Sequence, residues 1–194
     1  YWEDRDTTQD EIDVIDYLKN INNIKNKSIL HVGIGNSFFS NNFYKNNKIT
    51  GITISRKEIF KAQSLNLFNY IFFLIDKYSI EFQTFATNNK FDLVVDVNLK
   101  SYTCCQDSFK FYMNNLSKLL NTKGMIITSK KGMSWYKHLK PKLSFNIKKF
   151  FYFKMKEIDG NRENILSEND IDFFNKKNLF DFYTDKKICY FLKK

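Results

Sequence analysis

Short, continuously apolar segments recur along the first two thirds of this 194-residue chain, and stretches with helical character separate them. Apolar runs of this length, ended by polar residues or glycine, are typical of strands that are covered on both faces. Such strands occur in parallel sheets that carry helices on both sides. The sequence therefore predicts an α/β fold with five buried strands, at residues 28–32, 49–54, 70–75, 91–97 and 125–128.

The segments between these strands carry helix signals. In residues 9–21 an isoleucine or leucine recurs at every third position, so one face of a helix there is apolar, and Thr8 or Asp10 could cap it. We expect two further helices, at residues 55–65 and 106–120, the second of which ends in the polar turn 121–124.

The C-terminal third breaks this alternation. Two strands at 179–183 and 188–192 are joined by a tight turn, which predicts a hairpin whose last strand enters the sheet antiparallel, beside the sixth. Ser167 and Asp170 have the spacing of a capping box and predict a helix before the hairpin. Residues 130–165 fit neither pattern and are interpreted as an insertion or a substrate-side segment.

Length and composition are those of a single globular domain over residues 1–194, because 43% of the residues are hydrophobic and 27% are charged. No apolar run reaches the roughly 18 residues that a membrane span requires. Residues 3–6 are charged where a signal peptide would be apolar, and three cysteines are too few for a disulfide framework. We therefore expect a cytoplasmic protein. The aromatic stretch 150–153 is typical of a core or of an oligomer contact, so a homo-oligomer is also considered.

The net charge of +10 would ordinarily suggest a nucleic-acid partner. Arginine, which makes the bidentate contacts to phosphate and guanine, is nevertheless present only as Arg5, Arg56 and Arg162. The abundant Lys, Asn, Ile and Phe are the residues of A/T-rich codons, and codon bias accounts for the charge without selection for binding. A nucleic-acid partner is therefore the less favoured interpretation.

The motif that carries chemistry is a Gly-x-Gly turn, Gly33 and Gly35, directly after the first predicted strand. Glycines there let the backbone turn sharply and let a ligand approach where a side chain would collide. Phe38 stands where the full dinucleotide fingerprint has its third glycine, which disfavours a nicotinamide-dependent oxidoreductase. Polar residues also follow the next three strands, and because ligands of open α/β sheets bind at these carboxyl ends, they complete a predicted site.

In the order and spacing of its motifs the chain resembles a class I S-adenosylmethionine-dependent methyltransferase over nearly its whole length. Residues 29–35 resemble the first motif of that family, 91–96 the fourth, 119–127 the fifth-strand motif, and 167–180 the penultimate helix with the turn that follows it. The resemblance implies a Rossmann-like, seven-stranded, mostly parallel sheet with a C-terminal antiparallel hairpin and helices on both faces.

Two positions depart from the family pattern: His31 and Thr53 stand where the family usually has acidic residues. Residues 51–55 resemble the Gly-Leu-Thr-Leu-Ser variant of methyltransferases related to cyclopropane fatty acid synthases, in which a polar side chain five positions after the threonine reaches the ribose. Glu58 has that place here. The resemblance thus implies S-adenosyl-L-methionine as cofactor, and the candidate cofactor-binding residues are His31, Gly33, Gly35, Asn36, Ser37, Thr53, Ser55, Glu58, Asp76 and Asp96.

The acceptor is less constrained by the sequence. Candidate acceptor-binding residues lie on loops above the same sheet edge: Asn98, Tyr102, Trp135 and Tyr136. Neither a catalytic residue nor a metal site is indicated, since Cys104 and Cys105 are adjacent and have no second ligand pair. We expect a methyltransferase that acts on a small-molecule or sugar-like acceptor; the alternatives are an RNA methyltransferase and a non-catalytic methyltransferase-like binding protein.

Overall fold

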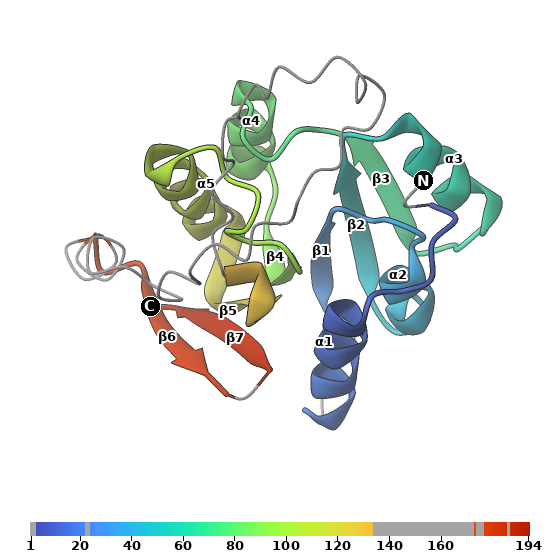
Figure 1. The fold of residues 1–194 in the computed structure, drawn as a ribbon, viewed down its shortest axis with the longest axis horizontal. Coiled ribbons are helices and arrows are strands. Elements are labelled where there is room, and N and C mark those ends of the chain that lie inside the picture. Colours follow the sequence, from blue (N-terminus) through green and yellow to red (C-terminus); the bar gives the residue numbers. More distant parts are fainter. Residues whose placement is uncertain (1–2, 22–23, 134–172, 174–176, 186) are drawn as a thin grey trace, which may run out of the picture.

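The computed structural model describes residues 3–21, 24–133, 173, 177–185 and 187–194 of the chain. Within them a single mixed sheet of seven strands has the order β3-β2-β1-β4-β5-β7-β6 (Figure 1). The strands are β1 (Ser28–Val32), β2 (Lys48–Thr53), β3 (Tyr70–Leu74), β4 (Phe91–Val95), β5 (Leu120–Ser129), β6 (Phe180–Thr184) and β7 (Ile188–Lys193).

The pairing of the strands confirms the predicted topology. The first five strands are parallel to one another, and β7 is antiparallel both to β5 and to β6. The C-terminal hairpin therefore closes the sheet with its last strand inserted between β5 and β6.

Five α-helices lie among the described residues: α1 (Gln9–Asn20), α2 (Phe38–Phe43), α3 (Arg56–Ser64), α4 (Ile80–Asn88) and α5 (Gln106–Leu119). A short 3₁₀ helix, η1 (Lys131–Met133), follows β5. Three helices have a side-chain N-cap formed by a serine or threonine directly before the helix. The hydroxyl oxygens of Thr8, Ser55 and Ser79 each accept a hydrogen bond from a backbone N–H in the first turn. Helices α2 and α4 have no boundary that the sequence pattern predicts. The first has only six residues and no side-chain cap, and the second is rich in phenylalanine and threonine, which are weak helix formers.

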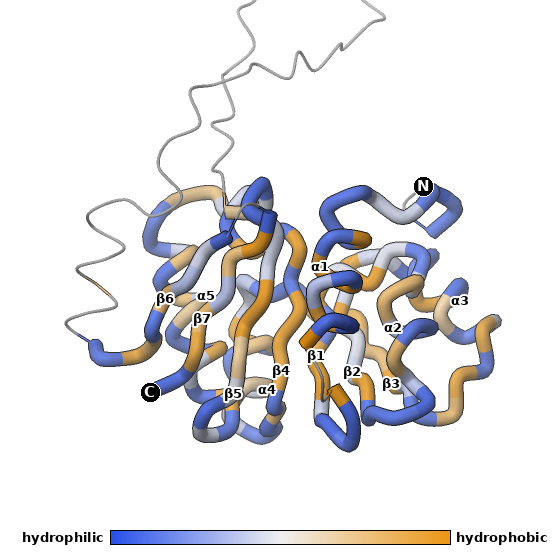
Figure 2. The backbone as a smooth tube through the Cα atoms, turned by 90° about the horizontal axis from the view of Figure 1, so that it is seen from below, coloured by the Kyte–Doolittle hydropathy of each residue, from blue (hydrophilic) through white to orange (hydrophobic). Residues whose placement is uncertain are grey.

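Alternate residues of each strand point to opposite faces of the sheet, and each face has its own core. Helices α4 and α5 cover one face, where Leu30 and Val32 of β1 contribute to the core. Helices α1, α2 and α3 cover the other, where Ile29 of β1 is buried. Figure 2 shows the result as apolar central strands with hydrophilic connections around them. None of the helices in the described part of the chain has the length and apolar character that crossing a membrane requires.

The structure corrects some of the predicted boundaries. Strand β4 ends at Val95, not at residue 97, and β5 begins at Leu120, directly after α5. The polar turn expected at 121–124 is an irregular part of β5, where Lys123 has a φ of 61° and the register with β4 shifts. The insertion assigned to 130–165 and the capping box at Ser167 lie almost wholly outside the described residues.

Strand β3 was expected to be buried and is instead an outer strand of the sheet. Ile71, Phe73 and Leu74 are 58%, 43% and 42% exposed. An apolar run of five residues has the same pattern in a central and in an edge strand, so the sequence could not distinguish the two.

Candidate functional site

The carboxyl ends of β1, β2, β3 and β4 lie at one edge of the sheet, where the strand order reverses between β1 and β4 (Figure 1). Ligands of open α/β sheets bind at such a switch point. Gly33, Asp76 and Asp96 follow β1, β3 and β4, and Thr53 is the last residue of β2. The fold therefore brings these four predicted positions to a single edge.

The Gly-x-Gly turn has the backbone that only glycine adopts without strain. Gly33 and Gly35 have φ values of 72° and 50°, in the left-handed region. The N–H of Gly33 donates to the carbonyl of Ile52, 2.8 Å away, and so ties the turn to the end of β2. A Cβ built on either glycine would have no atom within 4 Å. The turn thus presents bare backbone to open space at the ligand-binding edge.

Glu58 connects the glycine turn to the end of β2. Its Oε2 accepts a hydrogen bond from the hydroxyl of Thr53 at 2.6 Å and from the N–H of Gly35 at 3.0 Å. Ser55 caps α3 through the N–H of Glu58, and this cap sets the first turn of the helix so that the carboxylate faces back toward β2. Three residues predicted from the sequence therefore form one cluster with Gly35, and neither bond uses Oε1 of Glu58.

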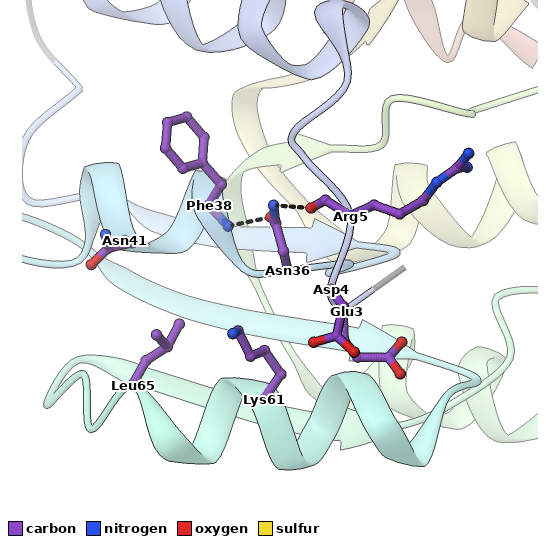
Figure 3. Close-up of a pocket in the computed structure, with 8 residues that line it drawn as sticks. All are labelled: Glu3, Asp4, Arg5, Asn36, Phe38, Asn41, Lys61 and Leu65. Atoms are coloured by element: carbon purple, nitrogen blue, oxygen red, sulfur yellow. Dashed lines mark hydrogen bonds between the residues drawn. The ribbon is translucent and has the colours of Figure 1, made fainter. Parts of the chain in front are cut away.

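The side chain of Asn36 binds both the N-terminal segment and the start of α2. Its Nδ2 donates to the carbonyl of Arg5 and to the hydroxyl of Thr7, both at 3.0 Å, and its Oδ1 accepts from the N–H of Phe38 (Figure 3). The side chain thus anchors the N-terminal segment to the start of α2.

A hollow of about 260 Å³ lies beside this anchor, on the helix side of the turn. Its lining residues are Glu3, Asp4, Arg5, Asn36, Phe38, Asn41, Lys61 and Leu65 (Figure 3). Asn36 is the one predicted cofactor residue that lines it, and neither glycine of the turn nor Glu58 does, so the hollow lies beside the glycine turn.

His31 and Ser37 lie beneath the turn. The ring of His31 packs against Phe39 at a centroid distance of 4.8 Å, and its Nδ1 lies 3.4 Å from the hydroxyl of Ser40. Ser37 is fully buried, 3.2 Å from the hydroxyl of Tyr70. Since residue 31 is 1% exposed and residue 37 not at all, these two side chains support the turn from below and do not face a ligand at its surface.

The stability of the protein should depend on pH through His31. Burial lowers the pKa of this imidazole to about 3, whereas an unfolded histidine titrates near 6.5. The unfolded state therefore binds an extra proton between these values, and His31 should by itself contribute a rise of about 2–3 kcal/mol in the free energy of unfolding from pH 4 to pH 7.

Urea unfolding at several pH values would measure this slope, and His31→Gln should remove it. The carboxyl of the half-buried Glu11, whose pKa is raised to about 7 by desolvation, contributes with the opposite sign above pH 4.5. The comparison is therefore between wild type and variant at each pH. Equal slopes in the two proteins would contradict the assignment to His31.

Asp96 lies at the centre of a buried charge network. Its Oδ2 accepts from Lys77 Nζ at 2.7 Å and from the hydroxyl of Tyr112 at 2.9 Å, and its Oδ1 accepts from the N–H of Asn98. The Lys77 side chain is 14% exposed and that of Asp96 only 3%. A carboxylate with this many partners orders the loops after β3 and β4 rather than serving as an unpaired base.

Two tyrosines complete this network. Lys77 Nζ lies 5.3 Å from the ring centre of Tyr78 and 5.0 Å from that of Tyr112, within the range of cation–π attraction. Burial, and then the charge of Asp96, raise the pKa of both hydroxyls above the ordinary tyrosine range. Sequence reasoning missed Lys77 and Tyr112, because a lysine after a strand and a tyrosine on the buried face of a helix carry no motif.

The remaining predicted residues lie at the rim. Asp76 is exposed and its Oδ1 accepts from the N–H of Tyr78 in a turn after β3. Asn98 and Tyr102 are also exposed, on the loop between β4 and α5. Trp135 and Tyr136 lie outside the described residues. Within the described ranges, no three His, Cys, Asp or Glu side chains are grouped so that they could hold a metal ion.

Comparison with known proteins identifies the fold. No protein-family model matches the sequence, and neither does any curated protein at a significant level. Solved structures do match. The N-methyltransferase NodS from Bradyrhizobium japonicum WM9, in complex with S-adenosyl-L-homocysteine, superposes with a TM-score of 0.62 at 12% identity, over 97% of this chain and 89% of that one. Magnesium protoporphyrin IX methyltransferase from Synechocystis PCC 6803, with bound S-adenosylmethionine, superposes with a TM-score of 0.56 at 16% identity, over 94% of this chain and 77% of that one. The chain therefore has the class I methyltransferase fold.

Proposed function

We propose that this protein is an S-adenosyl-L-methionine-dependent methyltransferase that acts on a small-molecule or sugar-like acceptor. The observation that carries the proposal is the turn after β1, where Gly33 and Gly35 leave open space and Glu58 stands at the neighbouring strand end. This arrangement lies at the switch point of a sheet whose hairpin gives the methyltransferase strand order.

The residues present fit this cofactor. Bare backbone at the glycine turn accommodates the close approach of the amino-acid part, and the Glu58 carboxylate can accept hydrogen bonds from ribose hydroxyls. Asp76, exposed after β3, suits the adenine end. When bound, the cofactor supplies an activated methyl group, so the task of the protein is to hold donor and acceptor in line.

The acceptor side is built by the loop after β4. Asn98 and Tyr102 are exposed there, and the Asp96 network holds the loop in place. An exposed tyrosine ring can stack on a flat or sugar-like ring, and no described group in this network is an unpaired base. The proposal therefore favours an acceptor that needs little help in losing a proton. Two of the structural neighbours, NodS and coclaurine N-methyltransferase, are N-methyltransferases.

Calorimetric titration tests the cofactor directly. S-adenosylmethionine and S-adenosylhomocysteine should each bind with one site per chain, and NAD(H) should not bind. Binding of NAD(H) without binding of either sulfur compound would reject the proposal in favour of an oxidoreductase.

Replacing Glu58 should weaken cofactor binding without abolishing it. Glu58→Ala deletes one charged acceptor and the tie between Thr53 and Gly35, which should cost about 1–3 kcal/mol of binding free energy, or roughly 5- to 150-fold in Kd. Glu58→Gln keeps the size of the side chain and one acceptor oxygen and should lose less. Calorimetry with S-adenosylhomocysteine measures both, and an unchanged Kd in Glu58→Ala would remove Glu58 from the site.

A non-catalytic binding protein is the second candidate, and the occupied carboxylate of Asp96 favours it. The two candidates differ in turnover. Release of S-adenosylhomocysteine in the presence of amine and sugar-like acceptors supports the enzyme, whereas tight cofactor binding with no release for any acceptor supports the binding protein.

We propose no nucleic-acid partner, since the positive charge rests on lysine. Any RNA binding should be weak and should vanish by about 0.15 M salt. Retained sub-micromolar affinity for a defined RNA would instead favour an RNA methyltransferase.

The cysteines among the described residues are free thiols, two of them exposed, which suits the proposed cytoplasmic location.

A further inference from the structure

The outer edge of the sheet at β3 has the properties of a protein interface. In the described part of the chain β3 pairs with β2 and with no other strand. Eleven large apolar side chains of the described residues are exposed, and seven of them belong to this end of the molecule: Ile54, Phe60, Phe68, Ile71, Phe73, Leu74 and Ile80. On β3 itself Ile71, Phe73 and Leu74 are exposed, and uncovered apolar side chains along a strand at the sheet edge are typical of an interaction site.

The backbone of β3 offers hydrogen-bonding groups along the same edge. The N–H of Ile75 donates to Thr53, and the carbonyl of Asn69 accepts from Ile49, so the odd-numbered residues of the strand direct their backbone groups to β2. Backbone direction alternates along a strand, and the N–H groups of Phe72 and Leu74 therefore point away from the sheet. The N–H of Tyr70, the third even-numbered residue, is already bonded to the carbonyl of Leu67.

We propose that the occupant of this edge is a second copy of the same chain, with the two β3 strands antiparallel about a two-fold axis at Phe72. In this register Phe72 pairs with Phe72 of the second copy, and Tyr70 pairs with Leu74. Both outward N–H groups of each copy are then used, with the carbonyls of Phe72 and Tyr70 as acceptors. Ile71 lies directly opposite Phe73, in the close, non-hydrogen-bonded type of pair.

Self-pairing is favoured because the strand carries nothing that prevents it. Edge strands are usually protected by charges or proline, and Tyr70–Leu74 contains neither. The opposite edge strand, β6, contains Asp181, which forms an ion pair with Lys194 at 3.0 Å. Pairing of the two β3 strands would cover the exposed side chains of Ile71, Phe73 and Leu74 together with the outward-directed backbone groups of the edge.

Sedimentation velocity of the full chain tests the proposal. Wild type should dimerise within roughly 1–100 μM, and more tightly as salt screens the net charge of +10 on each copy. Ile71→Lys and Phe73→Glu should each be monomeric. An equimolar mixture of the two should dimerise again, because the proposed register sets the introduced lysine of one variant chain opposite the introduced glutamate of the other.

Tyr183→Lys is the matched control. Tyr183 is 44% exposed on β6, against 43% for Phe73 on β3, so the control makes an equivalent surface change at the other edge and should still dimerise. Circular dichroism and S-adenosylhomocysteine binding report whether each variant is folded. The two cofactor edges face in opposite directions in the proposed dimer, so cofactor binding should not change with association, and failure of one proposal leaves the other standing.

Three results would overturn the dimer. A wild type that stays monomeric at about 100 μM shows that this edge has another occupant or none. Loss of association in Tyr183→Lys places the contact elsewhere. A mixture of the two variants that stays monomeric, while wild type dimerises, excludes the register.

Discussion

Gly35→Val should lower the affinity for S-adenosylhomocysteine by at least about 100-fold. Gly35 has a φ of 50°, a conformation that a β-branched residue enters only with strain, and its Cβ position opens onto the space proposed for the cofactor. The valine side chain would therefore occupy that space as well as distort the turn. Calorimetry with wild type and variant measures the loss.

A control variant must show that the loss of affinity does not come from backbone strain alone. Lys123 has a φ of 61° in the irregular start of β5, away from the ligand-binding edge, and it already carries a Cβ, so Lys123→Val adds only the β-branched part of the strain without entering the site. This control should lose at most about 1 kcal/mol of stability and keep its affinity. A folded Gly35→Val protein that binds as wild type does would remove the glycine turn from the cofactor site.

Lys77→Met should destabilise the fold by about 2–4 kcal/mol, because the nearly buried carboxylate of Asp96 would lose its countercharge. Methionine retains most of the apolar stem of the side chain whose Nζ lies over the rings of Tyr78 and Tyr112, so the change removes mainly the charge. Urea unfolding at neutral pH gives the difference in the free energy of unfolding.

The double variant shows whether the charge pair is responsible. Asp96→Asn in the Lys77→Met background removes the unpaired charge and should recover part of the stability, whereas Asp96→Asn alone should be destabilising. Additive losses in the double variant would mean that the two side chains do not interact. The interaction spans 19 residues of sequence, and it holds the loops after β3 and β4 together beside the site.

Local features of the site could be predicted because they depend on spacing within one short segment. Thr53, Ser55 and Glu58 meet at the start of α3, where the serine cap and the first helical turn bring Glu58 back to Thr53, five positions earlier in the chain. The glycine turn is local in the same way, since two residues with positive φ follow a strand.

Contacts between distant segments could not be predicted in this way. Asn36 is a predicted cofactor residue, and its side chain also binds Arg5 and Thr7 because the N-terminal segment crosses the turn. His31 was also assigned to the cofactor, and the packing of α2 on the sheet places it in the core. In both cases the residue type and position were compatible with a ligand contact. In the folded protein, however, the side chain contacts a neighbouring segment of the chain.

The succession of strands, the antiparallel hairpin at the C-terminal end and the position of the glycine turn are all legible in the sequence alone. These features follow from periodicity and turn chemistry, which act between residues close in the chain. The edge position of one apolar strand, and the pairing of charges across the loops, emerge only when the chain is folded. Ile52 of β2 is 1% exposed and Ile71 of β3 is 58% exposed, although both lie in similar apolar runs. The physical reason is that burial depends on what packs against a strand, and at β3 no further strand among the described residues does so.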